Sequence, residues 1–157
     1  MSWVRAGERK HVPYENPERR RYHTLALYAP EGVQPAFDWI GSPRAFTGPD
    51  LVEFLLERPP CPVPLVIVLD NASLHHSRVV QEALPRLWAK RIYRYFLPPY
   101  SPELNEIEAV FRVIKHCDLP ERVYTPLAAL EAAVDGAYTR FEEQLLAQSS
   151  YQPRPAA

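Results

Sequence analysis

Asp70 stands at a position where a carboxylate can do chemistry. It closes the apolar run LVIVLD at residues 65–70, and ligands of α/β proteins bind at the carboxyl ends of strands. A carboxylate at such a position is costly unless a partner balances its charge, and a divalent cation is a common partner. The alternative interpretation is that Asp70 caps the following turn, together with Asn71 and Ser73.

Glu108 is the second acidic residue of interest, because it falls in the first turn of a helix that should begin at Asn105. Its alternative role is local. An N-cap asparagine and an acid three residues later form a capping box, and the helix macrodipole favours a carboxylate there. Glu106 competes for a ligand role, but residues two apart on a helix point about 200° apart, so both cannot easily face one ion.

His75 and His76 follow Asp70 in the turn that should enter the next helix, and Lys115 lies one turn beyond Phe111 on a later helix. Taken alone, a histidine in such a turn is a hydrogen-bonding or surface residue, and a helical lysine belongs to a solvated face. Position alone therefore assigns none of them a function.

The elements that must position these residues follow from periodicity and turn signals. Because LVIVLD is a continuous apolar run, we expect a strand buried on both faces. Val80, Leu84, Leu87 and Trp88 fall at helical spacing, and Pro85 should kink or split their helix. The predicted elements are strands over 22–29 and 33–41, a helix from Thr47 or Pro49 to before Pro59, a strand over 65–70, a helix over 76–90, a strand over 91–98, a helix over 105–116 and a last helix after Thr125 and Pro126. This order predicts a mixed α/β or α+β layer fold.

The composition is that of a globular protein. The chain has 157 residues, of which 46% are hydrophobic and 24% charged, so we assign one domain to residues 1–148 and expect 149–157 to be a disordered tail. Membrane-spanning and signal-peptide segments are not expected, since no apolar run reaches roughly 18 residues. Cys61 and Cys117 lie far apart, so we expect reduced thiols in a cytoplasmic protein. The net charge of −1 lacks the basic excess of dedicated nucleic-acid binders.

Two sequence blocks carry a family resemblance. They are D-N-A-S-L-H at 70–75 and L-P-P-Y-S-P-E-L-N-E-I-E at 97–108, followed by Lys115. Together they resemble the catalytic domain of the mariner-like bacterial insertion-sequence transposases, which are DDE superfamily endonucleases. The second block is long and unusual, and 37 residues lie between positions 70 and 108. Glu106 departs from the family pattern, which usually has proline there, but glutamate also suits a first helical turn.

The resemblance implies an α/β fold like ribonuclease H, a mixed sheet flanked by helices, and a chemistry of phosphodiester hydrolysis and strand transfer on DNA. It makes Asp70 the second catalytic carboxylate and Glu108 the third, both ligands of a pair of Mg²⁺ or Mn²⁺ ions. His75 would lie close enough to orient or tune this catalytic site, while Asn71 and Asn105 would hold the loops. The partners implied are transposon-end DNA and, in the active form, further copies of the same chain.

The first aspartate of the family has no equivalent that we can identify. The resemblance extends more weakly over residues 1–145 and includes Trp3 and Gly7, which match a tryptophan–glycine landmark. In the family the first strand and its aspartate precede that landmark, so we expect the sheet to lack its first strand. Asp38 falls in an outer strand, and Asp50 falls in a first helical turn where the macrodipole explains it. Two carboxylates hold a metal pair poorly, so we expect very low activity from this chain alone.

Three interpretations remain open. The chain is part of a transposase catalytic domain whose first aspartate comes from a separately encoded N-terminal half or a frameshifted fusion. Alternatively, it is a non-catalytic remnant or interaction module that pairs with an intact transposase and regulates it. The third interpretation is a stand-alone nuclease that uses another acid.

Overall fold

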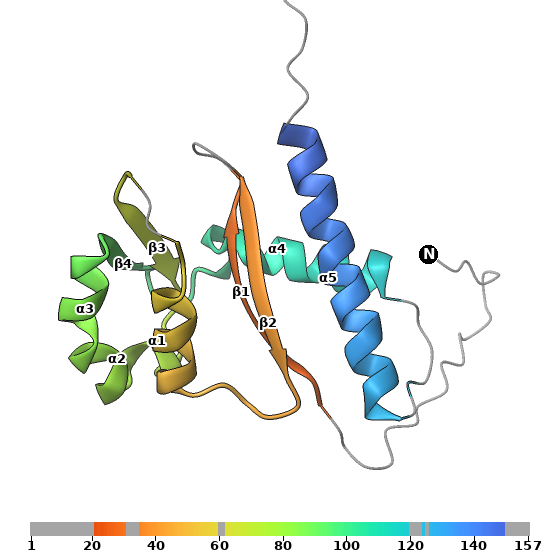
Figure 1. The fold of residues 1–157 in the computed structure, drawn as a ribbon, viewed down its shortest axis with the longest axis horizontal. Helices are drawn as coiled ribbons and strands as arrows, with labels where there is room; N and C mark the ends of the chain where they lie inside the picture. The colour runs from red at the N-terminus through yellow and green to blue at the C-terminus, as the bar shows by residue number, and fades with distance from the viewer. Residues whose placement is uncertain (1–20, 31–34, 60–61, 120–123, 125, 150–157) are drawn as a thin grey trace, which may run out of the picture. The chain divides into compact units, whose positions relative to one another are not determined.

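The computed structural model describes residues 21–30, 35–59, 62–119, 124 and 126–149, and these form a mixed α/β fold (Figure 1). The predicted fold class is therefore confirmed. The elements are β1 (His23–Ala29), β2 (Ala36–Ser42), α1 (Gly48–Leu56), β3 (Leu65–Leu69), α2 (Arg78–Glu82), α3 (Leu84–Ala89), β4 (Ile92–Phe96), α4 (Glu106–Val113) and α5 (Leu127–Ser149). The chain divides into two compact units, unit 1 within residues 1–44 and 109–157, and unit 2 over residues 45–108.

Unit 1 packs a β-hairpin against helices. Strands β1 and β2 pair antiparallel, from His23 opposite Ser42 to Ala29 opposite Ala36, and α5 lies against β2. The core of unit 1 consists of the buried residues Phe37, Val110, Ile114, Val134, Ala137 and Tyr138. Val110 and Ile114 lie four residues apart, as do Val134 and Tyr138, so each of the last two helical segments turns one face to this core, as amphipathic helices do.

Unit 2 is built around two parallel strands. Strands β3 and β4 run side by side with Leu65 opposite Ile92 and Leu69 opposite Phe96. A parallel pair needs a crossover connection, and α2 and α3 supply it. The core of unit 2 gathers buried aliphatic and aromatic side chains from the strands and helices, namely Leu51, Val52, Phe54, Leu55, Ile67, Leu69, Val80, Leu87 and Ile92.

Helix α1 begins where the sequence predicts, at a Thr47 N-cap with Pro49 in the first turn. The Asp50 carboxylate accepts hydrogen bonds from the Thr47 backbone nitrogen at 2.7 Å and from the Thr47 hydroxyl at 2.6 Å. Asp50 therefore caps its own helix.

The predicted helix over 76–90 is split. Residues Ser73–His76 form a 3₁₀ turn, and the chain then makes α2 and α3, with Pro85 in the first turn of α3. A proline cannot donate the hydrogen bond of a helix interior, so this split was expected. Trp88 does not join the core as its spacing suggested, since it is 51% exposed. The break at Ala83 interrupts the helical phase and leaves Val80 and Leu87 as the buried members of that stripe.

The prediction that the 65–70 strand is buried on both faces is wrong. Ile67 and Leu69 are buried, but Val66 is 57% and Val68 is 50% exposed. Successive side chains of a strand point to opposite faces, and the core-forming helices of unit 2 cover only the face that carries Ile67. A continuous apolar run does not reveal how many faces are covered.

Several predictions fall on residues that the structure does not describe: Trp3, Gly7, Cys61, Thr125 and all of the 149–157 tail except Ser149. Cys117 is a free, exposed thiol. Among the described residues, no helix is long and apolar enough to cross a membrane.

Candidate functional site

Asp70 directly follows β3, at the edge of the sheet where the parallel strands β3 and β4 both end. Its side chain is 49% exposed, and its Oδ1 accepts a hydrogen bond from the Ala72 backbone nitrogen at 3.0 Å. The turn-capping interpretation is therefore correct for one carboxylate oxygen. Within the described part of the chain, Oδ2 takes part in no hydrogen bond, so its lone pairs are available to a cation.

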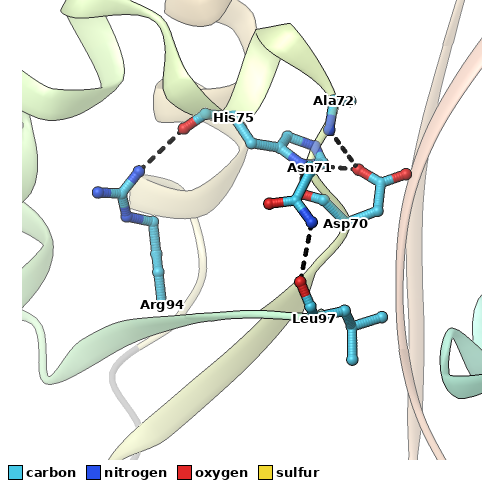
Figure 2. A network of polar contacts seen from close by, with 6 residues as sticks. All are labelled: Asp70, Asn71, Ala72, His75, Arg94 and Leu97. Atoms are coloured by element: carbon cyan, nitrogen blue, oxygen red, sulfur yellow. Dashed lines mark hydrogen bonds and ion pairs between the residues drawn. The ribbon is translucent and has the colours of Figure 1, made fainter. Parts of the chain in front are cut away.

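His75 holds the same carboxylate from the 3₁₀ turn (Figure 2). Its Nδ1 lies 3.1 Å from Asp70 Oδ1 and 3.1 Å from the Asp70 carbonyl oxygen. Both oxygens are acceptors at neutral pH, so we assign the ring proton to Nδ1. In the neutral imidazole the lone pair is then on Nε2. The His75 side chain is only 14% exposed, which fits a residue that orients Asp70.

Asn71 fastens the turn after β3 to the end of β4. Its side-chain nitrogen Nδ2 donates to the Leu97 carbonyl oxygen at 2.8 Å (Figure 2). This contact is the loop-holding role that the family resemblance implied for Asn71. Asn105 precedes α4, and its carbonyl oxygen accepts a hydrogen bond from the Glu108 backbone nitrogen at 3.0 Å.

Arg94, in the middle of β4, was missed by sequence reasoning. Its Nη1 donates to the His75 carbonyl oxygen at 3.0 Å, and its Nη2 donates to Gln81 Oε1 at 3.2 Å. The guanidinium carbon lies 5.4 Å from the centre of the Phe96 ring, a cation–π distance. Burial lowers the pKa of the Arg94 guanidinium from its usual value. The available signal was a charged residue inside the strand IYRYF, since such a charge needs partners.

Glu108 lies in the first turn of α4, as predicted, and is exposed. Among the described residues its carboxylate makes no hydrogen bond or ion pair, so the capping box considered for it does not form there. Nor does any hydrogen bond join Glu108 to Asp70 or His75 in that part of the chain. The structure thus brings Asp70 and His75 into contact and leaves the Glu108 carboxylate available.

The remaining polar residues have simpler roles. His76 stacks on Phe96, with ring centres 4.3 Å apart and planes at 17°. Glu106 is exposed at the start of α4, and Lys115 is exposed in a π-helical turn over Ile114–Asp118 that belongs to unit 1. Asp38 lies in β2, paired opposite Leu27. Within the described part of unit 2, neither His76 nor Glu106 makes a hydrogen bond to Asp70 or Glu108.

The side chains of Asp70 and Glu108 are of the chemical type that binds divalent cations. Carboxylate oxygens are the ligands that Mg²⁺ and Mn²⁺ prefer, and both side chains have uncommitted oxygens within the described region. The described residues hold no group of three or more His, Cys, Asp or Glu that could enclose an ion. These two residues would therefore form part of a metal site, and further ligands would have to come from elsewhere.

The sequence profile of the DDE superfamily endonucleases matches residues 1–125, and this chain belongs to that family. The match includes both Asp70 and Glu108 and covers most of the 157 residues. None of the curated proteins matches the chain. Membership implies DNA as the substrate and a chemistry that generally uses divalent metal ions.

Proposed function

We propose that this chain acts in DNA transposition, as part of the catalytic domain of a mariner-like insertion-sequence transposase. Asp70 and Glu108 are its metal-binding carboxylates, and His75 is the residue that holds Asp70. The observation that carries the proposal is the Asp70 carboxylate at the end of a parallel strand, with one oxygen held by Ala72 and His75 and the other uncommitted within the described residues.

Bound Mg²⁺ or Mn²⁺ would supply activation of a water or 3′-hydroxyl and stabilisation of the leaving oxygen. The chain's own residues have more limited tasks. Asp70 would hold the ion through Oδ2, while the hydrogen bond from the Ala72 nitrogen to Oδ1 restricts the rotation of the carboxylate. His75 donates from Nδ1 to Oδ1 and so helps to fix the orientation of the Asp70 carboxylate. Glu108 projects from the first turn of α4, where the helix dipole also favours a negative charge.

A further carboxylate must complete the site for a metal pair. The family resemblance assigns that role to a first aspartate, and a separately encoded half or a frameshifted fusion could provide it. We propose that the active form is assembled from more than one copy on transposon-end DNA, since the net charge of −1 gives this chain little affinity of its own for phosphates. The nucleotide sequence upstream of the Met1 codon tests the origin of the first aspartate directly. It should encode, in one of the three frames, an apolar strand that ends in aspartate.

The proposal is tested by DNA nicking in the presence of Mg²⁺ or Mn²⁺, with the chain supplied together with that upstream segment. We expect cleavage at transposon ends, and we expect Asp70→Asn and Glu108→Gln each to abolish it. Glu53→Gln on α1 is the matched control, because it also removes an exposed carboxylate from unit 2. Full nicking by both site variants would rule out the proposed site.

A second candidate function is an interaction module that pairs with an intact transposase. Two features favour it. Strands β3 and β4 form a sheet of only two strands among the described residues, so each has an edge available for pairing, and their outward face carries exposed Val66, Val68, Tyr93 and Tyr95. This function predicts co-purification with a full-length relative and inhibition of that relative. The Asp70→Asn variant should inhibit as well as the parent chain, whereas loss of inhibition in that variant would favour a catalytic role.

A further inference from the structure

The 3₁₀ turn Ser73–His76, which carries His75, is fastened to the neighbouring strand β4 and the residue after it. Arg94 donates to the His75 carbonyl oxygen, and Phe96 stacks on the His76 ring. Just before the turn, Asn71 donates to the Leu97 carbonyl oxygen. The turn's position relative to β3 is therefore set by contacts with two β4 side chains and with the Leu97 carbonyl oxygen.

Among the residues that hold this turn, Arg94 is the one whose burial is unfavourable for stability. It is partly buried, and the acceptors of its two Nη groups are a carbonyl and an amide oxygen, both neutral. Its Nε is buried and has no hydrogen-bond partner within the described residues. A buried donor without a partner lowers stability, and the neighbouring inward position of the same strand is occupied by the apolar Ile92. Stability alone therefore gives a weak reason for an arginine at this position.

The contact to His75 supplies a stronger reason. The carbonyl group that Arg94 binds belongs to the residue whose ring lies 3.1 Å from Asp70 Oδ1 (Figure 2). The second Nη group is tied to Gln81 on α2, the helix that follows the turn. The planar guanidinium thus joins the turn, the following helix and β4 in a fixed geometry, which a more flexible ammonium group would not reproduce.

We infer that Arg94 is a positioning residue of the candidate metal site. Through its hydrogen bond to the His75 carbonyl oxygen it holds the His75 ring, and thereby the Asp70 carboxylate, in the orientation that leaves Oδ2 open to a divalent cation. This inference rests on the proposed function, because it takes Asp70 to be a metal ligand. Residues that support a ligand in this way typically change metal affinity by about 10- to 100-fold when they are removed.

The first measurement is the tautomer of His75, read at a fixed pH of about 8 from long-range proton–nitrogen correlations of the chain labelled with ¹⁵N-histidine. His75→Gln identifies the signal among the five histidines. We expect the parent chain to carry the proton on Nδ1, and Arg94→Gln to shift the ring towards a mixture of tautomers. Arg94→Lys keeps one donor near the carbonyl oxygen and should restore the parent tautomer in part. Loss of stability alone would leave the tautomer of the folded molecules unchanged.

The second measurement is the Mn²⁺ concentration that broadens the signals of residues around Asp70. We expect Arg94→Gln to raise that concentration by about tenfold. Gln81→Ala changes an exposed residue and should also raise the Mn²⁺ concentration, by a smaller factor. It replaces Arg94→Gln in both measurements if that variant fails to fold. Arg86→Gln on α3 is the matched control, because Arg86 is exposed and should leave both measurements unchanged.

The outcomes separate the two proposals. An unchanged His75 tautomer in Arg94→Gln, or in Gln81→Ala where the former does not fold, overturns the positioning role whether or not Mn²⁺ binds. A shifted tautomer with unchanged Mn²⁺ affinity also overturns it, because Arg94 would then support the turn without affecting the ligand. Absence of Mn²⁺ broadening near Asp70, both in the parent chain alone and in the parent chain supplied together with the upstream segment, instead refutes the proposed metal site. A shifted tautomer together with weaker Mn²⁺ binding supports the inference.

Discussion

The two compact units of this chain are packed by different kinds of side chain. The core of unit 1 contains a cluster of aromatic rings, in which Phe37 lies 5.6 Å from the Tyr138 ring and 4.9 Å from the Phe141 ring. In unit 2 the core is largely aliphatic, and its fully buried residues include Leu55, Val80 and Leu87. The two described strands of unit 1 pair antiparallel, whereas the two strands of unit 2 run parallel and therefore end at the same edge of their sheet.

This difference explains where the candidate chemistry lies. The polar contacts described in unit 1 support packing, as in the 2.8 Å hydrogen bond between the Thr24 and Tyr138 hydroxyls. In unit 2 the polar contacts gather after β3 and β4, where Asp70, Asn71 and His75 share one turn region. The ends of parallel strands bring loops together, whereas a hairpin connects its two strands through its own turn.

The largest effect on stability should come from the centre of the aromatic core. Phe37 is 1% exposed, and Phe37→Ala should lower the free energy of unfolding by about 3–5 kcal/mol through lost burial and a residual cavity. Chemical denaturation measures the loss, and amide hydrogen exchange locates it. Phe37→Leu is the control and should cost less than half as much. A loss below about 1 kcal/mol for the alanine variant would show that the aromatic cluster contributes little.

Unit 2 allows the same test at two adjacent residues. Leu87 is fully buried, whereas Trp88 is 51% exposed. Leu87→Ala should lower the free energy of unfolding by about 2–4 kcal/mol, and Trp88→Ala should cost less than about 1 kcal/mol despite the larger side chain. Thermal unfolding of both variants compares them directly. The reverse order would mean that Trp88, as its sequence spacing first suggested, packs in the core.

A smaller effect is expected at the hydroxyl that joins the hairpin of unit 1 to α5. Tyr138→Phe removes the hydrogen bond to Thr24 and should cost about 1 kcal/mol near neutral pH. Burial raises the pKa of the Tyr138 phenol, an effect partly offset by its hydrogen bond with Thr24. A raised pKa in the folded state gives stability that is complete below the unfolded-state pKa of about 10 and is lost as the pH rises through the folded value. Denaturation at pH 8 and pH 11 should therefore show a smaller alkaline loss in Tyr138→Phe than in the parent chain.

The smallest effect on stability should come from the proposed metal ligand Glu108. Its carboxylate has no hydrogen bond within the described residues, so Glu108→Gln should change the free energy of unfolding by no more than about 0.5 kcal/mol. Thr47→Ala, which removes a cap at the start of α1, should cost about 1 kcal/mol and gives the scale of a true cap. Denaturation of both variants without metal makes the comparison. Equal losses in the free energy of unfolding for Glu108→Gln and Thr47→Ala would show that Glu108 caps its helix.

Much of the candidate site could be predicted from the sequence because its signals are local. An apolar run closed by an acid places Asp70 after a strand, and Asn105 followed by an acid places Glu108 in a first helical turn. Thr47 and Asp50 define a helix start through contacts three residues apart, and Pro85 splits a helix through its own missing donor. These features depend on residues that are close together in the sequence, so they can be predicted without knowledge of the tertiary structure.

The tertiary structure decided the features that depend on distant parts of the chain. The hydrogen bond from Arg94 to His75 spans 19 residues and exists because β4 pairs parallel to β3 with Leu65 opposite Ile92. A shift of that register by one residue would turn Arg94 to the opposite face. The exposure of Val66 and Val68 also depends on the tertiary structure. Periodicity fixes which side chains share a face of the strand, but only packing decides which face is covered. The sequence by itself determined which residues could do chemistry and on which elements they lie. The pairing of the strands decided which of these residues contact one another, because such contacts depend on the register of the strands and not on spacing along the chain.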